Sequence, residues 1–297
     1  MKPASPHVTE RRPVLEVERA ISDLRRGQPV ILEGVGSKRL NVVSGEHFPE
    51  AAAITDAEHP AVRLMKYAGL LPRAVVTPLS ADDAGMLTVS ATAIAQYPVA
   101  LAGSLVKVSE ANVSLKGAQD AKVIAFRPRF GHEEHLAVVI GDPRKQTAPY
   151  VRIHSSCVTG DVFGSLRCDC GSQLHKAIEI IEAAGGGAIV YLSQEGRGIG
   201  IANKLRAYAL QDTGLDTVEA NEALGFAPDE RDFALAATIL NMLELKRITL
   251  LTNNPEKVAG VSAHGITVEK RAPLVVEINP HNEKYLGTKA LKLGHQF

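Results

Sequence analysis

The three cysteines of this chain are the residues whose type and spacing most clearly predict chemistry. Cys157, Cys168 and Cys170 are the only cysteines in 297 residues. An odd number of thiols does not suit a disulfide framework. The single residue between Cys168 and Cys170 instead allows two thiolates to converge on one metal ion, and zinc favours such ligands. Buried free thiols or redox-active thiols are the alternative interpretation.

Three thiolates leave two kinds of zinc site open. A structural zinc site needs four protein ligands, so the cysteines alone do not complete one within this chain. His154 is the nearest candidate for a fourth ligand that would close the site. In a catalytic site the fourth position holds water instead, and zinc lowers the pKa of that water toward ~7, so that hydroxide forms at neutral pH.

The second half of the chain alternates predicted strands and helices, a pattern typical of an α/β domain with a mixed, partly parallel sheet and flanking helices. Strands are predicted at 136–140, 150–153, 188–192 and 248–251, and helices at 201–211 and 232–243. Ser172 is expected to cap a further helix that ends at the glycines 185–187. Pro255 suits the first turn of a last helix.

Three loops that follow predicted strands carry the polar residues of this half. They span residues 154–157, 193–200 and 252–257. Because ligands bind outside the carboxyl ends of strands in such sheets, we expect the three loops to form one cleft. Their glycines, hydroxyls, Arg197 and Lys257 suit a phosphate group. For Arg197 alone, a solvated surface arginine is the alternative interpretation.

The first half is expected to form a smaller α/β domain. Helices are predicted at 14–24 and 61–67, strands at 29–32 and 74–77, and an extended segment at 105–113. The weakest pattern lies near residues 109–119. We therefore divide the chain into domains 1–115 and 116–297.

Composition excludes several function classes. Lys plus Arg equals Asp plus Glu, 33 against 33, so no global basic field attracts nucleic acid or an anionic membrane. The chain contains no tryptophan, which argues against stacking platforms for single-stranded nucleic acid. It has no run of 18 apolar residues and no apolar signal core at its N-terminus, so a cytoplasmic location is expected.

A series of motifs in the second half strongly resembles GTP cyclohydrolase II, the zinc enzyme that opens riboflavin biosynthesis. The resemblance covers about residues 120–297. The motifs are 152–161 (RIHSSCVTGD), 165–171 (SLRCDCG), 194–197 (QEGR), 203–212 (NKLRAYALQD), 216–221 (DTVEAN), 224–226 (LGF), 229–233 (DERDF), 250–257 (LLTNNPEK) and a tail at 279–282 (NPHN). Several motifs in order at the family's spacing make the match specific.

The resemblance implies a role for each matching residue. Cys157, Cys168 and Cys170 would hold zinc with an open water position, Arg231 would be the nucleophile toward the α-phosphate, and Asp229 would be the proton acceptor. The residues implied to contact GTP are Arg152, Ile153, His154, Ser155, Ser156, Gln173, Glu195, Gly196, Arg197, Thr217, Thr252 and Lys257.

The implied reaction releases formate from C8 of GTP and pyrophosphate from its triphosphate, and it leaves 2,5-diamino-6-ribosylamino-pyrimidinone 5'-phosphate. Mg²⁺ is expected on the triphosphate because its hard oxygens suit that ion. We also expect a homodimer.

Elementary chemistry agrees with most of these roles. A carboxylate, that of Glu195 or another acidic residue, would accept hydrogen bonds from guanine, and buried groups left unpaired would reject adenine. Arginine is a demanding nucleophile because its guanidinium is normally protonated. The alternative interpretation of Asp229 and Arg231 is an ordinary helix start. Tyr208 is either a core aromatic or a residue of the site.

Two departures from family patterns leave other functions open. Ser156 stands where members often carry glutamate. Residues 17–31 and 60–76 resemble dihydroxybutanone phosphate synthase, but residues 33–40 lack its acidic metal-binding cluster, so we expect a degenerate, non-catalytic domain. The alternative functions are a related zinc cyclohydrolase for another nucleotide or pyrimidine, and a non-catalytic nucleotide-sensing zinc protein.

Overall fold

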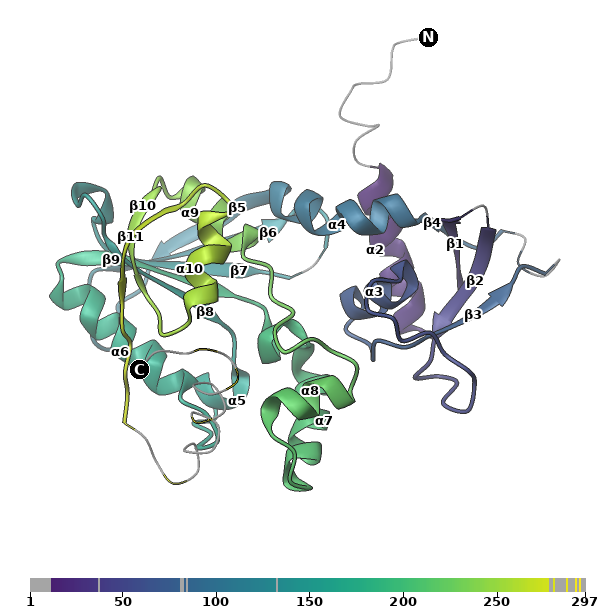
Figure 1. The fold of residues 1–297 in the computed structure, drawn as a ribbon. Coiled ribbons are helices and arrows are strands. Elements are labelled where there is room, and N and C mark those ends of the chain that lie inside the picture. Colours follow the sequence, from purple (N-terminus) through teal and green to yellow (C-terminus); the bar gives the residue numbers. More distant parts are fainter. Residues whose placement is uncertain are drawn as a thin grey trace, which may run out of the picture.

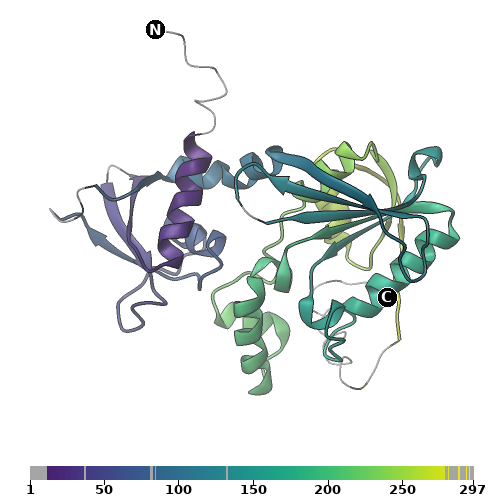
Figure 2. The same cartoon turned by 180° about the vertical axis from the view of Figure 1, so that it is seen from behind.

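The computed structural model describes residues 12–36, 38–80, 83, 85–131, 133–277, 280, 287, 292 and 294. Asn279, His281 and Asn282 of the tail motif lie outside the described residues. Two sheets with separate hydrophobic cores divide this part of the chain (Figures 1 and 2). No helix in it is long and apolar enough to cross a membrane.

The N-terminal sheet has four strands in the order β3-β2-β1-β4, in which only β1 and β4 pair in parallel. Its elements are α2 (Arg12–Arg25), β1 (Val30–Val35), β2 (Lys38–Ser44), α3 (Pro60–Tyr67), β3 (Ala74–Pro78), β4 (Thr88–Ser90) and α4 (Ala91–Gly103). One core joins the sheet to all three helices, which contribute buried apolar side chains such as Val17 and Leu24 of α2.

The second sheet has seven strands in the order β11-β10-β8-β9-β7-β6-β5. The strands are β5 (Leu105–Asn112), β6 (Ala121–Pro128), β7 (His135–Gly141), β8 (Tyr150–Ser155), β9 (Gly186–Leu192), β10 (Arg247–Leu251) and β11 (Thr267–Ala272). β8 to β11 pair in parallel, and β5, β6 and β7 join antiparallel. This arrangement confirms the predicted mixed, partly parallel sheet.

Helices cover both faces of this sheet. They are α5 (Val158–Asp161), α6 (Cys170–Ala183), α7 (Gly200–Asp212), α8 (Thr217–Ala223), α9 (Ala234–Met242) and α10 (Pro255–Ser262), with 3-10 turns η2 (Pro143–Lys145) and η3 (Glu195–Gly198). Ile189 of β9 packs with α6, whereas its neighbours Ala188 and Val190 pack with α9. This alternation follows from side chains that point to opposite faces of a strand.

Two details differ from the sequence-based expectations. α6 begins at Cys170 after Asp169, so the prediction of Ser172 as its cap is wrong, and a metal-ligand candidate occupies the first turn. β5, which begins at Leu105 and precedes the expected division at residue 115, is a strand of the second sheet.

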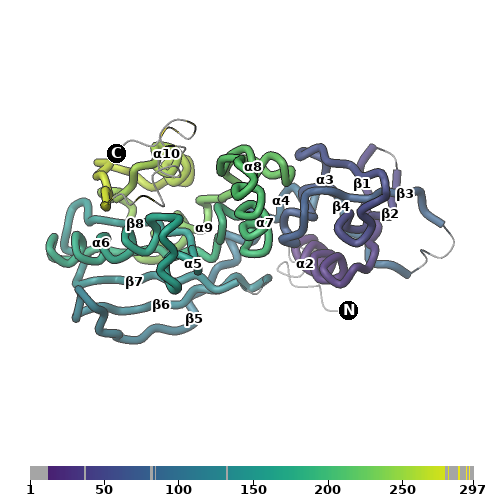
Figure 3. Tube along the Cα trace, turned by 90° about the horizontal axis from the view of Figure 1, so that it is seen from below, coloured from purple at the N-terminus to yellow at the C-terminus, as the bar shows by residue number. Residues whose placement is uncertain are grey.

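α7 and α8 lie beside the N-terminal domain, away from the main sheet (Figures 1 and 3). The side-chain amide of Asn203 in α7 donates to the carbonyl oxygen of Gly69, 3.1 Å away. The N-terminal domain therefore contacts α7, the helix that follows the second polar loop (residues 193–200).

Candidate metal centre and active site

The candidate site lies at the edge of the second sheet where three parallel strands end. β8, β9 and β10 end at Ser155, Leu192 and Leu251, so the loops that follow them meet at the same edge. One cavity is lined by residues of all three loops, of α7 and of α8. The structure thus brings together the three polar loops singled out in the sequence.

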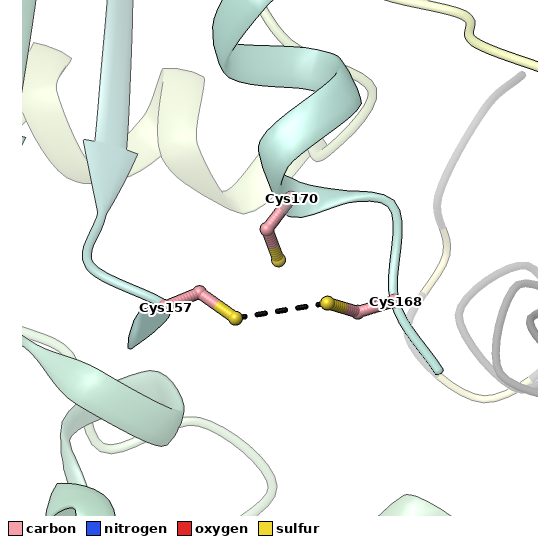
Figure 4. Close-up of side chains that lie close together, drawn as sticks. All are labelled: Cys157, Cys168 and Cys170. Carbon is pink, nitrogen blue, oxygen red and sulfur yellow. Dashed lines mark hydrogen bonds between the residues drawn. The ribbon is translucent and has the colours of Figure 1, made fainter. Parts of the chain in front are cut away.

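The three cysteine side chains point toward one another at this edge (Figure 4). Their sulfur atoms all lie within 4.8 Å of one another, and the Sγ atoms of Cys157 and Cys168 are 3.7 Å apart. Two thiolates on one tetrahedral zinc with ~2.3 Å bonds lie about 3.8 Å apart. The type of these donor atoms and the Cys157–Cys168 separation therefore suit a zinc ion.

Two glycines allow the cysteines to converge. A Cβ atom at Gly160 in α5 would lie 2.7 Å from the Sγ of Cys168 and 3.1 Å from the Sγ of Cys157. A Cβ atom at Gly171 would lie 2.4 Å from the carbonyl oxygen of Gly160. The close approach of α5 and α6 thus depends on the absence of side chains at both positions.

His154 is turned toward a carboxylate and does not join the cysteine cluster. Its Nε2 lies 3.1 Å from Oδ2 of Asp161, and its ring stacks on that of Tyr191. The same Oδ2 accepts from the backbone N–H of Cys157. Burial lowers the pKa of His154. Among the described residues the only group of donor atoms suited to a metal is the three thiols, so the geometry does not favour a closed site with His154.

A buried lysine joins the cysteine cluster to the second loop. The ammonium group of Lys204 in α7 donates to Cys157 Sγ at 3.1 Å and to Glu195 Oε1 at 2.6 Å. The other carboxylate oxygen of Glu195 accepts from the N–H of Val158 at 2.7 Å. Burial would lower the pKa of Lys204, but the hydrogen bonds with Glu195 and Cys157 raise it above the ordinary value.

Buried cationic groups also line the cavity. Arg152 donates to the carbonyl oxygen of Leu251 and to Oε1 of Gln173, and Lys257 donates to the carbonyl oxygen of Ile153. Nε of Arg152 and Nη2 of Arg197 are buried without a hydrogen-bond partner in the described chain. Orphaned guanidinium donors beside a cavity suit an anionic ligand.

The turn that carries Arg197 is strained. Both Gly196 and Arg197 have left-handed backbones, with φ of 62° and 63°. Arginine adopts this region at a cost of about 1 kcal/mol or more, and such strain concentrates at functional sites.

Asp229 and Arg231 form an ion pair with more than one hydrogen bond. Burial would raise the pKa of Asp229, but Arg231 outweighs burial and holds that pKa below its usual value. Nη1 of Arg231 also reaches 3.5 Å from Ser155 Oγ. α9 begins at Ala234, so the two residues lie before its first turn and the helix-start interpretation does not describe them.

Comparison with known proteins decides the family. A sequence model of the family described as GTP cyclohydrolase II matches residues 106–273. A GTP cyclohydrolase-2 from Azospirillum brasilense is 41% identical over 321 residues, which cover 98% of this chain and 83% of that protein. The chain belongs to the GTP cyclohydrolase II family.

One further relative of this cyclohydrolase is longer than the chain, and one solved structure is more distant. The riboflavin biosynthesis protein RibBA of Bacillus subtilis is 54% identical over 175 residues, which cover 59% of this chain and 44% of that protein. The structure of RibBX, a two-domain 3,4-dihydroxy-2-butanone 4-phosphate synthase from A. baumannii, aligns over 88% of this chain and 99% of that one. Its TM-score is 0.36 at 13% identity, which is too low to establish a shared fold.

The cavity of the cyclohydrolase gathers most of the residues expected from the sequence. Arg152, His154, Ser155, Ser156, Cys157, Cys168, Cys170, Gln173, Glu195, Gly196, Arg197, Thr217, Arg231, Thr252 and Lys257 line it. Ile153 is buried within β8 and offers only its backbone, and Asp229 reaches the site through Arg231.

Sequence reasoning missed Lys204 and the two glycines that allow the cysteines to converge. Helical spacing carried a signal for the lysine, because Lys204, Ala207, Tyr208 and Gln211 all line the cavity from one face of α7. The glycines carried none, because their importance lies in a close approach between α5 and α6.

Proposed function

We propose that this cyclohydrolase hydrolyses GTP, opens the imidazole ring and releases formate and pyrophosphate to leave 2,5-diamino-6-ribosylamino-pyrimidinone 5'-phosphate. The observation that carries the proposal is one cavity that is lined both by three converging thiols and by buried, unpartnered guanidinium donors. Ring opening needs an activated water, and a triphosphate needs cations, so the cavity supplies both requirements.

Zinc is the metal we propose for the cysteine cluster, with Cys157, Cys168 and Cys170 as its ligands. The sulfur separations fit its bond lengths, and no histidine or carboxylate among the described residues completes a fourth protein ligand. When bound there, zinc supplies Lewis acidity and lowers the pKa of a water molecule toward ~7.

The cationic side chains of the cavity are proposed to bind and orient the nucleotide. The donors of Arg152 and Arg197 would hold phosphate oxygens in charge-assisted hydrogen bonds. Asp229 accepts a hydrogen bond from the guanidinium of Arg231, which lines the cavity, and is proposed to accept a proton from it. Mg²⁺ on the triphosphate would neutralise the remaining phosphate charge.

Guanine recognition by Glu195 receives less support from the geometry. Both carboxylate oxygens of Glu195 already accept hydrogen bonds, one from Lys204 and one from the N–H of Val158. Each oxygen has a second lone pair, so a further bond to guanine is possible in principle. In the structure Glu195 primarily holds the lysine against the cysteine loop.

We also propose that the chain acts as a cytoplasmic homodimer. The exposed apolar side chains of Val162 and Phe163, 69% and 77% exposed, lie between the cysteine positions and offer a surface that a second copy would cover. Light scattering coupled to size exclusion would measure the mass in solution.

The N-terminal domain is proposed to lack synthase activity. Glu33 is the only acidic residue of the 33–40 stretch, and its carboxylate faces the guanidinium of Arg39 at 3.5 Å. A magnesium site usually uses one or two carboxylates, and the one carboxylate of this stretch pairs with a guanidinium. Purified protein given ribulose 5-phosphate without GTP should therefore produce no formate.

The deciding experiment incubates zinc-loaded protein with GTP and Mg²⁺ and measures formate, pyrophosphate and the diaminopyrimidine together. All three products should appear with the wild type. Cys168→Ser should lose its bound zinc and form none of the three products. Parallel reactions with ATP and other nucleotides distinguish a related cyclohydrolase of different specificity. GTP binding without any formate, in folded and zinc-loaded protein, would favour the nucleotide sensor and reject the proposal.

A further inference from the structure

The segment of residues 226–233, which carries the proposed proton acceptor and nucleophile, has no regular secondary structure and is held by its own domain through several hydrogen bonds, among them one from Arg231 to Ser155 and one from Arg197 to Pro228. The N–H of Glu230 donates to the carbonyl oxygen of Arg197 at 3.1 Å. The side-chain amide of Gln194 donates to the carbonyl oxygen of Asp232 at 2.8 Å. Both of these bonds come from the second polar loop, so the position of that loop and the position of the segment are linked.

A further attachment comes from the N-terminal domain. Nζ of Lys66 lies 2.7 Å from Oε1 of Glu230, and the two side chains are only 15% and 19% exposed. The same Oε1 accepts from the N–H of Ala227 at 2.7 Å. Oε1 of Glu230 therefore accepts a hydrogen bond within the turn 227–230 and also pairs with Lys66 of the N-terminal domain.

Lys66 is attached to a fixed element. It occupies the last turn of α3, whose residues Ala61, Val62, Leu64 and Met65 are buried in the N-terminal core. The helix is capped by His59, whose side chain accepts from the N–H of Ala61. The packing of the N-terminal domain thus sets the position of the ammonium group.

The surroundings of the pair make this attachment important. Lys66 and Glu230 both line a cavity of about 690 Å³ between the two domains, together with residues such as Tyr67 and Asp232. On this side the segment borders open space instead of close-packed side chains. Phe226 and Phe233 are buried at the two ends of the segment, and the ion pair restrains the part between them on the side that faces this cavity.

We propose that the N-terminal domain positions the 226–233 segment for catalysis through the Lys66–Glu230 ion pair. Lys66 is a positioning residue, because it acts through Glu230 on the neighbouring Asp229 and Arg231. The catalytic part of this inference rests on the proposed GTP hydrolysis, whereas the ordering of the segment does not. The domain with no expected synthase activity thereby gains a role in the reaction of the other domain.

The first test separates turnover from binding. Lys66→Met keeps the aliphatic stem and removes the charge, and we expect kcat for formate release to fall about ten-fold with KM within about two-fold, because small misplacements of reacting groups mainly cost turnover. Lys66→Arg should restore most of kcat. Glu230→Gln keeps an oxygen for Ala227, and the double variant should be no worse than either single variant if the residues act as a pair.

The second test needs no substrate. Hydrogen–deuterium exchange of the amides in 226–233 should be faster in Lys66→Met than in the wild type. Glu46→Gln is the matched control, because it weakens the interdomain pair of Glu46 with Arg206 at 2.9 Å but keeps an oxygen for the N–H of Leu71. We expect the control to leave both kcat and the exchange of 226–233 unchanged.

Each outcome bears on one proposal. Absence of formate from the wild type would reject GTP hydrolysis and leave exchange as the test of segment ordering. Unchanged exchange in folded, zinc-loaded Lys66→Met and Glu230→Gln would overturn the ordering. Faster exchange with unchanged kcat would overturn the catalytic role, and equal effects in Glu46→Gln would show that the pair has no specific part.

Discussion

The ammonium group of Lys204 lies 3.1 Å from the Sγ of Cys157. Lys204 belongs to α7, whereas Cys157 follows β8, so the contact joins α7 to the loop that carries the first cysteine. A hydrogen bond from a cation reduces the negative charge that three thiolates concentrate on one metal. The same group binds Glu195, whose carboxylate holds the N-terminus of α5.

Replacing Lys204 with methionine should weaken zinc binding about 10- to 100-fold, because groups that hydrogen-bond to metal ligands typically contribute that much affinity. Competition with a chromogenic chelator measures the change. Lys176→Met on α6 is the control, since that lysine is half exposed and pairs only with Glu179 among the contacts the structure gives it. Equal zinc affinity in Lys204→Met and the wild type would show that the lysine does not support the site.

Gly160→Ala should abolish high-affinity zinc binding. The added Cβ would lie 2.7 Å from the Sγ of Cys168, so the sulfur atoms must move apart. Zinc content after dialysis measures the effect. Gly103→Ala is a matched control, because a Cβ there meets nothing within 4 Å. Retention of a full equivalent of zinc by Gly160→Ala would mean that the loop adjusts without loss.

Much of the fold follows from patterns that a strand or helix must display. β9 and β10 are almost continuously buried, and α2 carries one apolar stripe, so both kinds of element could be predicted. α4 could not, because its apolar residues surround the helix and Pro98 interrupts it. β11 could not either, because this edge strand is mostly polar and exposed.

The site residues that belong to sequence motifs could be predicted. Residues whose role depends only on a close approach between elements in space could not. The cysteine spacing and the polar loops indicated which residues would meet. Gly160 and the Lys66–Glu230 pair depend on approaches between elements that are distant in sequence. The role expected for Glu195 shows the same limit, because its actual partners come from α7 and α5.

The burial of His135 predicts that the folded protein loses stability in mild acid. His135 is 1% exposed, its Nδ1 accepts from the N–H of Ser193, and burial lowers its pKa from 6.5 to about 4. Between these values the unfolded chain binds a proton that the folded chain does not, so stability falls as pH decreases. At pH 5 the loss relative to pH 7 is about 2 kcal/mol, from ~1.4 kcal/mol per pKa unit.

Urea unfolding of His135→Asn measures this contribution. Asparagine keeps an acceptor for Ser193 and does not titrate, so the variant should lose about 2 kcal/mol less than the wild type between pH 7 and pH 5. Acid release of metal affects both proteins equally and cancels in the comparison. Identical pH dependence would assign the acid sensitivity to other groups.

Asp229→Asn should lower kcat about 10²- to 10⁴-fold, the usual contribution of a positioned proton acceptor. The amide keeps a hydrogen bond to Arg231 but neither carries the charge nor accepts its proton. Because Arg231 holds the pKa of Asp229 below its ordinary value, the carboxylate is already ionised at neutral pH. Wild-type activity should therefore show no loss from protonation of Asp229 between pH 6 and pH 9.

The control for Asp229→Asn is Asp212→Asn, which neutralises an exposed carboxylate that pairs with Arg167 at the end of α7. Formate release and zinc content should be measured for both variants. If both variants kept a full equivalent of zinc and only Asp229→Asn had a strongly reduced kcat, proton acceptance by Asp229 would be supported. If Asp229→Asn retained wild-type kcat, Arg231 would not need this carboxylate, and its role as a nucleophile would lose its chemical basis.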